Sequence, residues 1–294
     1  MPAKQAANEN ERPHSLSARP PTSEARRGPV AGPRLTPFSV VTVAFVALFL
    51  IMVLALILAD IFYTDAASFR KALASREVLH AMKLSLVTSF TSLAIIILFA
   101  IPVGYALSRY RFPGQAIVNT LVDLPLVMPP IVVGFSLLIF FNTRVGRFIE
   151  SLGIQFVYTV PGIILCQFLV SASFGIRTAA AAFDGVDRRL EELALTLGCG
   201  RGQAFWRVAL PMARSGIVAG AIIAWAHVVG LFGPLMVFAG STRMKTEVMP
   251  TTIFLELSIG RLEVALAVAL MMLAAATVAL IVVHTLAPGR RWSG

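Results

Sequence analysis

Side chains able to carry out acid–base, nucleophilic or metal chemistry are few and widely separated in this sequence. The histidines stand at positions 14, 80, 227 and 284, and none belongs to a His-Glu-x-x-His metal motif. A Gly-x-x-x-x-Gly-Lys-Ser/Thr loop, which would cradle the phosphates of ATP, is also absent from the sequence. No nucleophile stands out with a base and an orienting group. We therefore predict no catalytic residue, no metal site and no cofactor, and expect that the chain by itself is not an enzyme.

The most clearly patterned polar segment runs from 184 to 211 and predicts a short amphipathic helix. Asp187 can cap the start of this helix, and Gly198 can close its end. Pro211 then suits the first turn of the following helix. The apolar residues recur at the spacing of one helix face. They are Leu190, Leu193, Ala194 and Leu197.

A helix of this kind has two possible roles. It could lie on lipid headgroups as an interfacial helix, or it could dock into a groove of a partner protein. The predicted helix is only about three turns long, and it carries acidic as well as basic residues. Its apolar face lacks an aromatic residue. These features favour docking, and both roles stay open on this pattern alone.

A second feature is a cluster of prolines inside an otherwise apolar stretch. Pro125, Pro129 and Pro130 lie within six residues. Proline removes a backbone donor and clashes with the preceding turn, so we predict that no continuous helix runs through this segment. Broken helices at membrane depth occur where they line a cavity or are buried in protein. The alternative is a kink that only helps packing.

His227 is the only ionisable group in the apolar stretch 215–242. Ionisable residues inside a membrane usually face the protein interior and often have a function. A neutral histidine that forms a hydrogen bond with a neighbouring helix explains the sequence equally well. Both interpretations remain open.

The composition shows what surrounds these segments. The chain has 294 residues, of which 57% are hydrophobic and 14% charged, and its mean hydropathy is +0.81. A soluble domain contains about 25% charged residues. The excess of apolar side chains cannot be hidden in one water-facing globule, so we expect lipid to surround most of the chain.

Long charge-free stretches divide the chain into about six membrane spans. Those that contain no Asp, Glu, Lys or Arg are 38–59, 84–108, 124–143, 151–176, 215–242 and 264–289. Each is long enough for a helix to cross the hydrocarbon core, whereas barrel strands would show shorter alternating segments. We predict an all-α, polytopic membrane domain over 38–289. Its spans are expected at about 38–59, 84–108, 117–143, 155–182, 213–240 and 263–287.

Basic residues indicate the orientation of these spans. The net charge is +10, and Arg and Lys concentrate in the N-terminal tail and in alternate loops. We read this charge as a topology signal and as contacts with lipid headgroups, not as a nucleic-acid surface. Residues 1–37 predict a disordered, basic cytoplasmic tail because they contain almost no large apolar side chains. Both termini are expected on the cytoplasmic side of a bacterial inner membrane.

The patterned segment 184–211 resembles the EAA loop of bacterial ATP-binding-cassette (ABC) importer permeases. That loop reads Glu-Ala-Ala, three residues, Gly, nine residues, Ile, one residue, Leu-Pro. Leu193 and Val208 replace an Ala and the Ile with other apolar residues. The matching positions are Glu192, Ala194, Gly198, Leu210 and Pro211. The resemblance implies that the helix is a coupling helix seated in a cleft of a cytoplasmic ATPase.

The resemblance extends from about Leu84 to His284. Segments 111–114, 123–134 and 230–233 are similar to the permeases for molybdate, tungstate and sulfate. This family implies a type I, MetI-like permease that works with two ATPase subunits, an extracytoplasmic binding protein and a second permease copy. In the molybdate-like pattern a basic residue and a Glu flank the glycine of the fifth span, where this chain has His227 and Leu231. Import of ferric ion or a polyamine is therefore the alternative to import of an oxyanion.

The expected mechanism is alternating access, in which the ATPases displace the coupling loop and so tilt the helices on either side of it. The predicted pathway residues are Asp123, Pro125, Pro129, Pro130, Gly134, His227, Gly230 and Gly233. Small residues of the fifth span would allow close, sliding helix contacts or would simply pack. These are Gly216, Ala219, Gly220 and Ala224. A secondary transporter would be expected to show repeats and intramembrane carboxylates, and a membrane scaffold for an ATPase is the third alternative.

Overall fold

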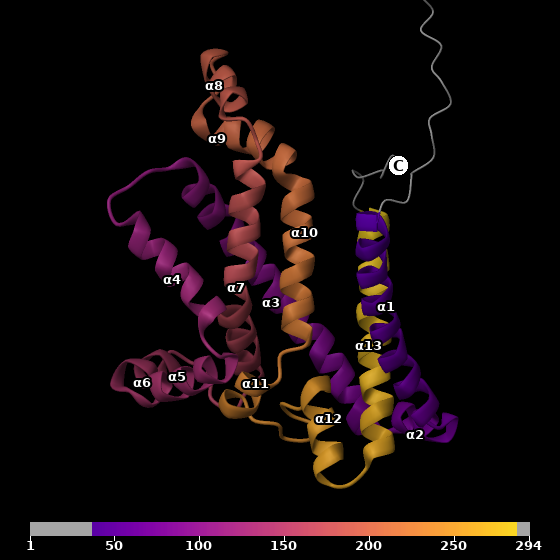
Figure 1. Cartoon of the computed structure of the whole chain (residues 1–294). Helices are drawn as coiled ribbons and strands as arrows, with labels where there is room; N and C mark the ends of the chain where they lie inside the picture. Colours follow the sequence, from indigo (N-terminus) through magenta and orange to yellow (C-terminus); the bar gives the residue numbers. More distant parts are fainter. Residues whose placement is uncertain (1–36, 287–294) are drawn as a thin grey trace, which may run out of the picture. The chain divides into compact units, whose positions relative to one another are not determined.

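Prolines, glycines and capping residues cut the apolar sequence into a series of helices (Figure 1). The computed structural model describes residues 37–286, and all regular structure in this range is helical. The predicted tail 1–37 therefore lies outside the described residues except for Pro37. The helices are α1 (Pro37–Tyr63), α2 (Ala66–Ala74), α3 (Arg76–Arg109), α4 (Gln115–Val127), α5 (Pro130–Asn142), α6 (Arg144–Ser151), α7 (Val160–Asp184), α8 (Arg188–Thr196), α9 (Arg201–Ala204), the π-helical segment η1 (Phe205–Ala209), α10 (Leu210–Val229), α11 (Gly233–Phe238), α12 (Met249–Ser258) and α13 (Leu262–Leu286).

The chain divides into two units, 1–54 and 55–294, and the boundary between them lies inside α1. Helix α1 is 27 residues long and contains no buried residue. A helix that is apolar on all sides and exposes its side chains is stable when its solvent is lipid. This matches the expectation of a membrane span at 38–59.

Helices α3, α7 and α10 form the centre of the second unit because small residues let them approach closely. A Cβ atom added at Gly104 of α3 would lie 2.8 Å from the Cβ atom of Ala179 in α7. A Cβ atom added at Gly220 of α10 would lie 2.0 Å from the Oγ1 atom of Thr178, also in α7. Contacts this short leave no room for any side chain larger than hydrogen. Helix α7 is thus packed between its two neighbours.

The proline cluster breaks the third predicted span, as expected. Helix α4 ends at Val127, α5 starts at Pro130, and the two helices are bent by 111° relative to each other. Pro129 and Pro130 lack the amide N–H groups that would continue the hydrogen bonding of α4. The prediction that no continuous helix crosses 117–143 is confirmed.

The fifth predicted stretch, 213–240, is not one helix, which corrects that boundary. The helical path begins earlier, at Arg201, and runs through α9, η1 and α10 to Val229. Gly230 ends it, and α11 starts only at Gly233 with Pro234 in its first turn. Charge-free length does not reveal this break, because Gly230 and Pro234 carry no charge and so do not interrupt the stretch, although glycine commonly follows a helix end and proline favours a helix start.

The described helices include four that are long and apolar enough to cross a membrane, and five if α4 and α5 count as one bent span. The four are α1, α3, α7 and the continuous path from Arg201 to Val229. In α13, residues 262–278 form a shorter apolar helix. The predicted fold class, an all-α polytopic membrane protein, is confirmed. The division into six spans remains a prediction.

A cluster of charged residues joins the start of α3 to the segment before and inside α12. The Arg243 guanidinium donates to the carboxylates of Glu77 and, at 2.8 Å, Glu256. Glu247 is fully buried next to them. Burial raises the pKa of Glu247; the negative charges of Glu77 and Glu256 act in the same direction, and the opposing positive charge of Arg243 does not outweigh them.

Glu247→Gln is expected to stabilise the protein at neutral and alkaline pH. Because its native pKa is raised, the native state holds this proton more tightly than the unfolded chain does. Stability is therefore highest below the unfolded pKa and is lost as the pH rises through the native pKa. The amide stays neutral, so at pH 8 the thermal unfolding midpoint should rise by about 2–4 °C, equivalent to roughly 1 kcal/mol.

The measurement compares thermal unfolding of the purified protein in detergent at pH 5 and pH 8. Glu192→Gln is the matched control, because Glu192 is exposed and its neutralisation removes no burial cost. A gain from Glu247→Gln that is the same at both pH values would contradict this explanation.

Candidate functional site

The helix predicted within 184–211 is α8, and it has both predicted ends. The Oδ1 atom of Asp187 accepts a hydrogen bond from the Arg189 N–H at 3.0 Å. Gly198 follows the helix with φ of +89°, a left-handed conformation that favours glycine. The Cys199 N–H then donates to the Ala194 carbonyl at 3.0 Å, which completes a Schellman-type end. These bonds make α8 a short helix with fixed ends.

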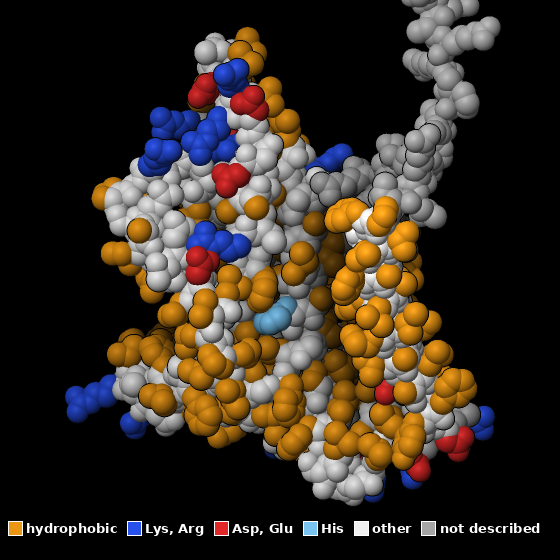
Figure 2. Space-filling view, viewed as in Figure 1, with side chains coloured by type: hydrophobic (Ala, Val, Ile, Leu, Met, Phe, Trp, Pro, Cys, Tyr) orange, Lys and Arg blue, Asp and Glu red, His pale blue; other side chains and the backbone are white. Residues whose placement is uncertain are grey.

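The predicted apolar face of α8 is mostly uncovered. Ala194 is buried, with 8% of its surface exposed. Leu190, Leu193 and Leu197 are 37%, 56% and 84% exposed. Figure 2 shows hydrophobic side chains beside acidic and basic ones at this end of the second unit. Three exposed leucines on one flank of a rigid helix form a surface suited to a protein groove; we call it the α8 leucine flank.

Glu191, which the sequence analysis did not select, attaches α8 to the rest of the second unit. Its carboxylate accepts hydrogen bonds from Arg109 Nε and from the Tyr105 hydroxyl, each at 2.7 Å. The side chains of Arg109 and Glu191 are only 7% and 12% exposed. The neighbouring Glu192, which matches the family pattern, is exposed. The helix spacing could have indicated the burial of Glu191, because residues three apart lie on the same side of a helix and Ala194 is buried.

Further contacts join this loop to the end of α3. Ser108 donates a hydrogen bond to Asp184 at 2.6 Å, and Arg188 donates one to the carbonyl of Ser108. The Tyr105 ring packs edge-on against Phe183 and Phe205, with ring centroids 5.2 and 4.7 Å apart. The loop is therefore held by α3 as well as by the two helices that it connects.

The last two residues of the predicted coupling loop lie at the start of α10. Leu210 packs against a small buried cluster that includes Phe183 and Ala213, and Pro211 stands in the first turn of the helix. Proline is favoured there because the first amide groups have no intrahelical acceptor. These residues connect the loop to a helix that runs to the other candidate site.

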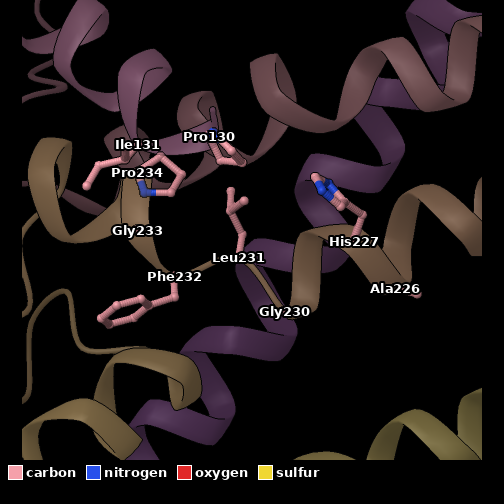
Figure 3. A pocket seen from close by; sticks show the side chains of 9 residues that line it. All are labelled: Pro130, Ile131, Ala226, His227, Gly230, Leu231, Phe232, Gly233 and Pro234. Carbon is pink, nitrogen blue, oxygen red and sulfur yellow. The ribbon is translucent and has the colours of Figure 1, made fainter. Parts of the chain in front are cut away.

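Four of the predicted pathway residues line one pocket of about 530 Å³ (Figure 3). They come from the start of α5, the end of α10, the turn that follows it and the first residue of α11. They are Pro130, His227, Gly230 and Gly233. Figure 3 shows the His227 imidazole pointing toward Pro130 and Leu231. The breaks in the two apolar stretches thus meet at one place.

His227 both borders this pocket and has a partner on a neighbouring helix. Its Nδ1 atom lies 3.0 Å from Ser171 Oγ, and its ring centroid lies 4.6 Å from that of Phe174. Both contacts come from α7. The two interpretations of His227 are therefore compatible, because the hydrogen bond orients a ring that also faces the pocket.

The other predicted pathway residues do not line this pocket. A Cβ atom added at Gly134 would lie 2.7 Å from the carbonyl oxygen of Pro234, so this glycine lets α5 approach α11. Pro125 lies inside α4 near its end, and Pro129 immediately precedes α5. These three residues shape the bend and its packing. Asp123 has a different contact.

Asp123 forms a two-point ion pair with Arg177 of α7, a residue that the sequence analysis missed. Arg177 Nε and one terminal nitrogen lie 2.5 and 2.7 Å from the two Asp123 oxygens. Arg177 also donates to the side-chain and backbone oxygens of Asn119, at 3.0 and 2.9 Å. The charge-free stretch 151–176 stops just before Arg177, yet the predicted span 155–182 contains it. A single Arg in one predicted span and a single Asp in another were the available signal.

Residues 96–292 match the model of the family described as the inner membrane component of binding-protein-dependent transport systems. The chain belongs to this family. As a permease of this kind it is a multi-pass protein of the inner membrane, and the resemblance stated from the EAA-like loop is confirmed.

Curated relatives of this permease carry oxyanion names. It is 37% identical over 194 residues to the molybdate/tungstate transport system permease protein WtpB of Thermococcus kodakarensis, covering 65% of this chain and 74% of the relative. It is 31% identical over 254 residues to the sulfate transport system permease protein CysT of Escherichia coli, covering 85% and 92%. The chain is therefore an ABC importer permease with relatives named for molybdate, tungstate and sulfate.

Solved structures with the same fold include a bacterial alginate ABC transporter in complex with a pentasaccharide-bound periplasmic protein. This permease matches one of its chains with a TM-score of 0.71 and 20% sequence identity, over 85% of this chain and 93% of that one. A chain of the MetNI methionine ABC transporter matches with a TM-score of 0.55 and 21% identity, over 72% and 93%. These likenesses confirm the MetI-like fold.

Proposed function

We propose that two copies of this permease form the membrane path of an ATP-driven importer for a tetrahedral oxyanion such as molybdate, tungstate or sulfate. An extracytoplasmic binding protein would deliver the oxyanion, and two cytoplasmic ABC ATPase subunits would hydrolyse ATP. The names of the relatives support this substrate class. In this arrangement both chain termini and α8 lie on the cytoplasmic side.

The observation that carries the proposal is the α8 leucine flank (Leu190, Leu193 and Leu197), which is exposed on a helix that is otherwise firmly attached. A loose loop would absorb the motion of an ATPase, whereas a helix fixed by the buried Glu191–Arg109 pair transmits it. The exposed flank provides the apolar surface that an ATPase cleft would cover. We assign α8, with Glu192 and Gly198, as the coupling helix.

The motion would reach the pocket through α3 and α10. Helix α8 is bonded to the end of α3 through Glu191. After the turn at Gly198, the chain passes through α9 and η1 into α10. Helix α10 is 20 residues long, so it spans roughly 30 Å between the coupling loop and Gly230. A tilt of α10 at its first residue would therefore move His227 and Gly230, which line the pocket. This is how ATPase closure would change access to the path.

Leu193→Asp is expected to remove the ATPase from the purified complex. A charged side chain buried in an apolar cleft costs several kcal/mol, enough to weaken binding by roughly a hundredfold. The measurement is co-purification of the ATPase with the tagged permease, followed by oxyanion uptake in cells. Both should fall to background while the amount of permease in the membrane stays unchanged.

Leu195→Asp is the matched control, because Leu195 is also exposed and lies on the same helix but outside the leucine flank. It should retain the ATPase. Equal retention by the two variants would argue against the coupling assignment. Stimulation of ATP hydrolysis by binding protein loaded with molybdate, sulfate or ferric ion tests the substrate class separately, and stimulation by ferric ion alone would exclude oxyanion import.

A further inference from the structure

Arg177 places a positive charge well inside a helix that otherwise crosses the membrane as an apolar segment. It stands seven residues before the end of α7 at Asp184. A charged side chain at such a position is costly, and it commonly marks the route of a substrate or ion. The side chains of Arg177 and Asp123 are 32% and 44% exposed, so the pair is accessible and not enclosed in the core. Figure 2 shows a basic and an acidic side chain adjoining each other over α4 and α7.

The geometry around Arg177 is that of an oxyanion-binding site in which a carboxylate stands in the place of the anion. Nε and a terminal nitrogen donate in parallel to the two oxygens of Asp123. Asn119 accepts two more hydrogen bonds and fixes the plane of the guanidinium group. Two parallel N–H donors match two oxygens of a tetrahedral oxyanion as well as they match a carboxylate. Asp123 therefore occupies the position that such an anion would take.

Arg177 lies on α7 one turn beyond the residues that contact His227, a side chain that lines the pocket. Ser171 and Phe174, which contact His227 at the pocket, precede it by six and three residues. Residues three apart lie on one side of a helix, so Arg177 lies on the same side of α7 as the residues that contact His227, one turn further along. Along α7, Arg177 lies on the side of these contacts that leads to the coupling loop.

We propose that Arg177, oriented by Asn119, is a transient binding site for the transported oxyanion, and that Asp123 occupies this site between transport events. The proposal rests on the proposed import of oxyanions. The incoming anion exchanges with the Asp123 carboxylate, so the guanidinium group keeps a negative partner throughout. This competition keeps binding weak, which release into the cytoplasm requires, and the exchange frees α4 from α7.

The test is equilibrium binding of radioactive sulfate and molybdate to the purified permease–ATPase complex without binding protein. Asp123→Asn removes the competing charge while retaining the shape of the side chain. It should bind at least one of the two anions about tenfold or more tightly than the natural protein, the effect expected for one charge-assisted pair. Asp123→Asn combined with Arg177→Gln should lose this gain. Equal binding by the single and the double variant would overturn the proposal.

Arg177→Lys keeps the charge and a partner for Asp123 but cannot donate two parallel hydrogen bonds. It should lower oxyanion uptake by roughly tenfold at unchanged complex yield and unchanged ATPase stimulation by loaded binding protein. Unchanged uptake would overturn the proposal even if Asp123→Asn fails to fold. A wild-type complex that imports neither anion would instead refute the proposed function, whereas the binding comparison would still decide whether Arg177 holds an anion.

Discussion

Replacing Glu191 with alanine is expected to abolish import, because it detaches α8, the proposed coupling helix, from α3. Arg109 would keep its buried position without the carboxylate that now lies 2.7 Å away. Breaking a buried ion pair by removing one partner costs about 3–5 kcal/mol. For a chain of this size the thermal unfolding midpoint should fall by about 6–20 °C. Thermal unfolding in detergent and uptake of molybdate and sulfate in cells measure the two effects.

Glu192→Ala provides the comparison for this experiment, because Glu192 is the adjacent acid and is exposed. It should leave the unfolding midpoint within about 1–2 °C of the natural protein, since it breaks no buried pair. Any loss of import by Glu192→Ala should be accompanied by loss of the ATPase from the complex. If both alanine variants gave the same midpoint, the Glu191–Arg109 pair would not be what holds α8 in place.

The ends of α8 were predictable from the sequence, whereas its orientation was not. Asp187 and Gly198 act on backbone groups within a few residues, and local signals of this kind are visible in sequence. Which flank of the helix is buried depends on Arg109, which is 82 residues away from Glu191. An apolar stripe suggests a buried face, yet here the leucines are outside and an acid is inside. Only the fold decides between Glu191 and Glu192.

The same distinction applies to the predicted pathway residues. The bend between α4 and α5 follows from the chemistry of proline and was predicted. The meeting of Pro130 with His227 and Gly230 depends on how α5 and α10 pack, which no local pattern encodes. Arg177 lies inside the predicted span 155–182 but was missed, because no local pattern links it to a partner in another span. Its pairing with Asp123 makes the charge tolerable inside α7.

Gly220→Ala is expected to separate α7 from α10 and so to block import. The new Cβ atom would lie 2.0 Å from Thr178 Oγ1 and 2.5 Å from Thr178 Cβ. Thr178 cannot easily turn away, because its hydroxyl donates to the carbonyls of Phe174 and Gly175. The helices must therefore move apart, at a cost of about 1–3 kcal/mol. Uptake should fall by roughly tenfold or more, because α10 is the proposed link between the coupling loop and the pocket.

Gly202→Ala is the matched control for this substitution, because a Cβ atom at that position would have no other part of the protein within 4 Å beyond its chain neighbours and its own helix backbone. It should leave both the unfolding midpoint and uptake close to those of the natural protein. Thr178→Gly combined with Gly220→Ala moves the small residue to the opposite helix, and it should recover most of the lost uptake despite the cost of about 1 kcal/mol for glycine in α7. Recovery would show that the distance between α7 and α10, and not the glycine itself, controls import. Full uptake by Gly220→Ala alone would mean that this close contact is dispensable for the transport cycle.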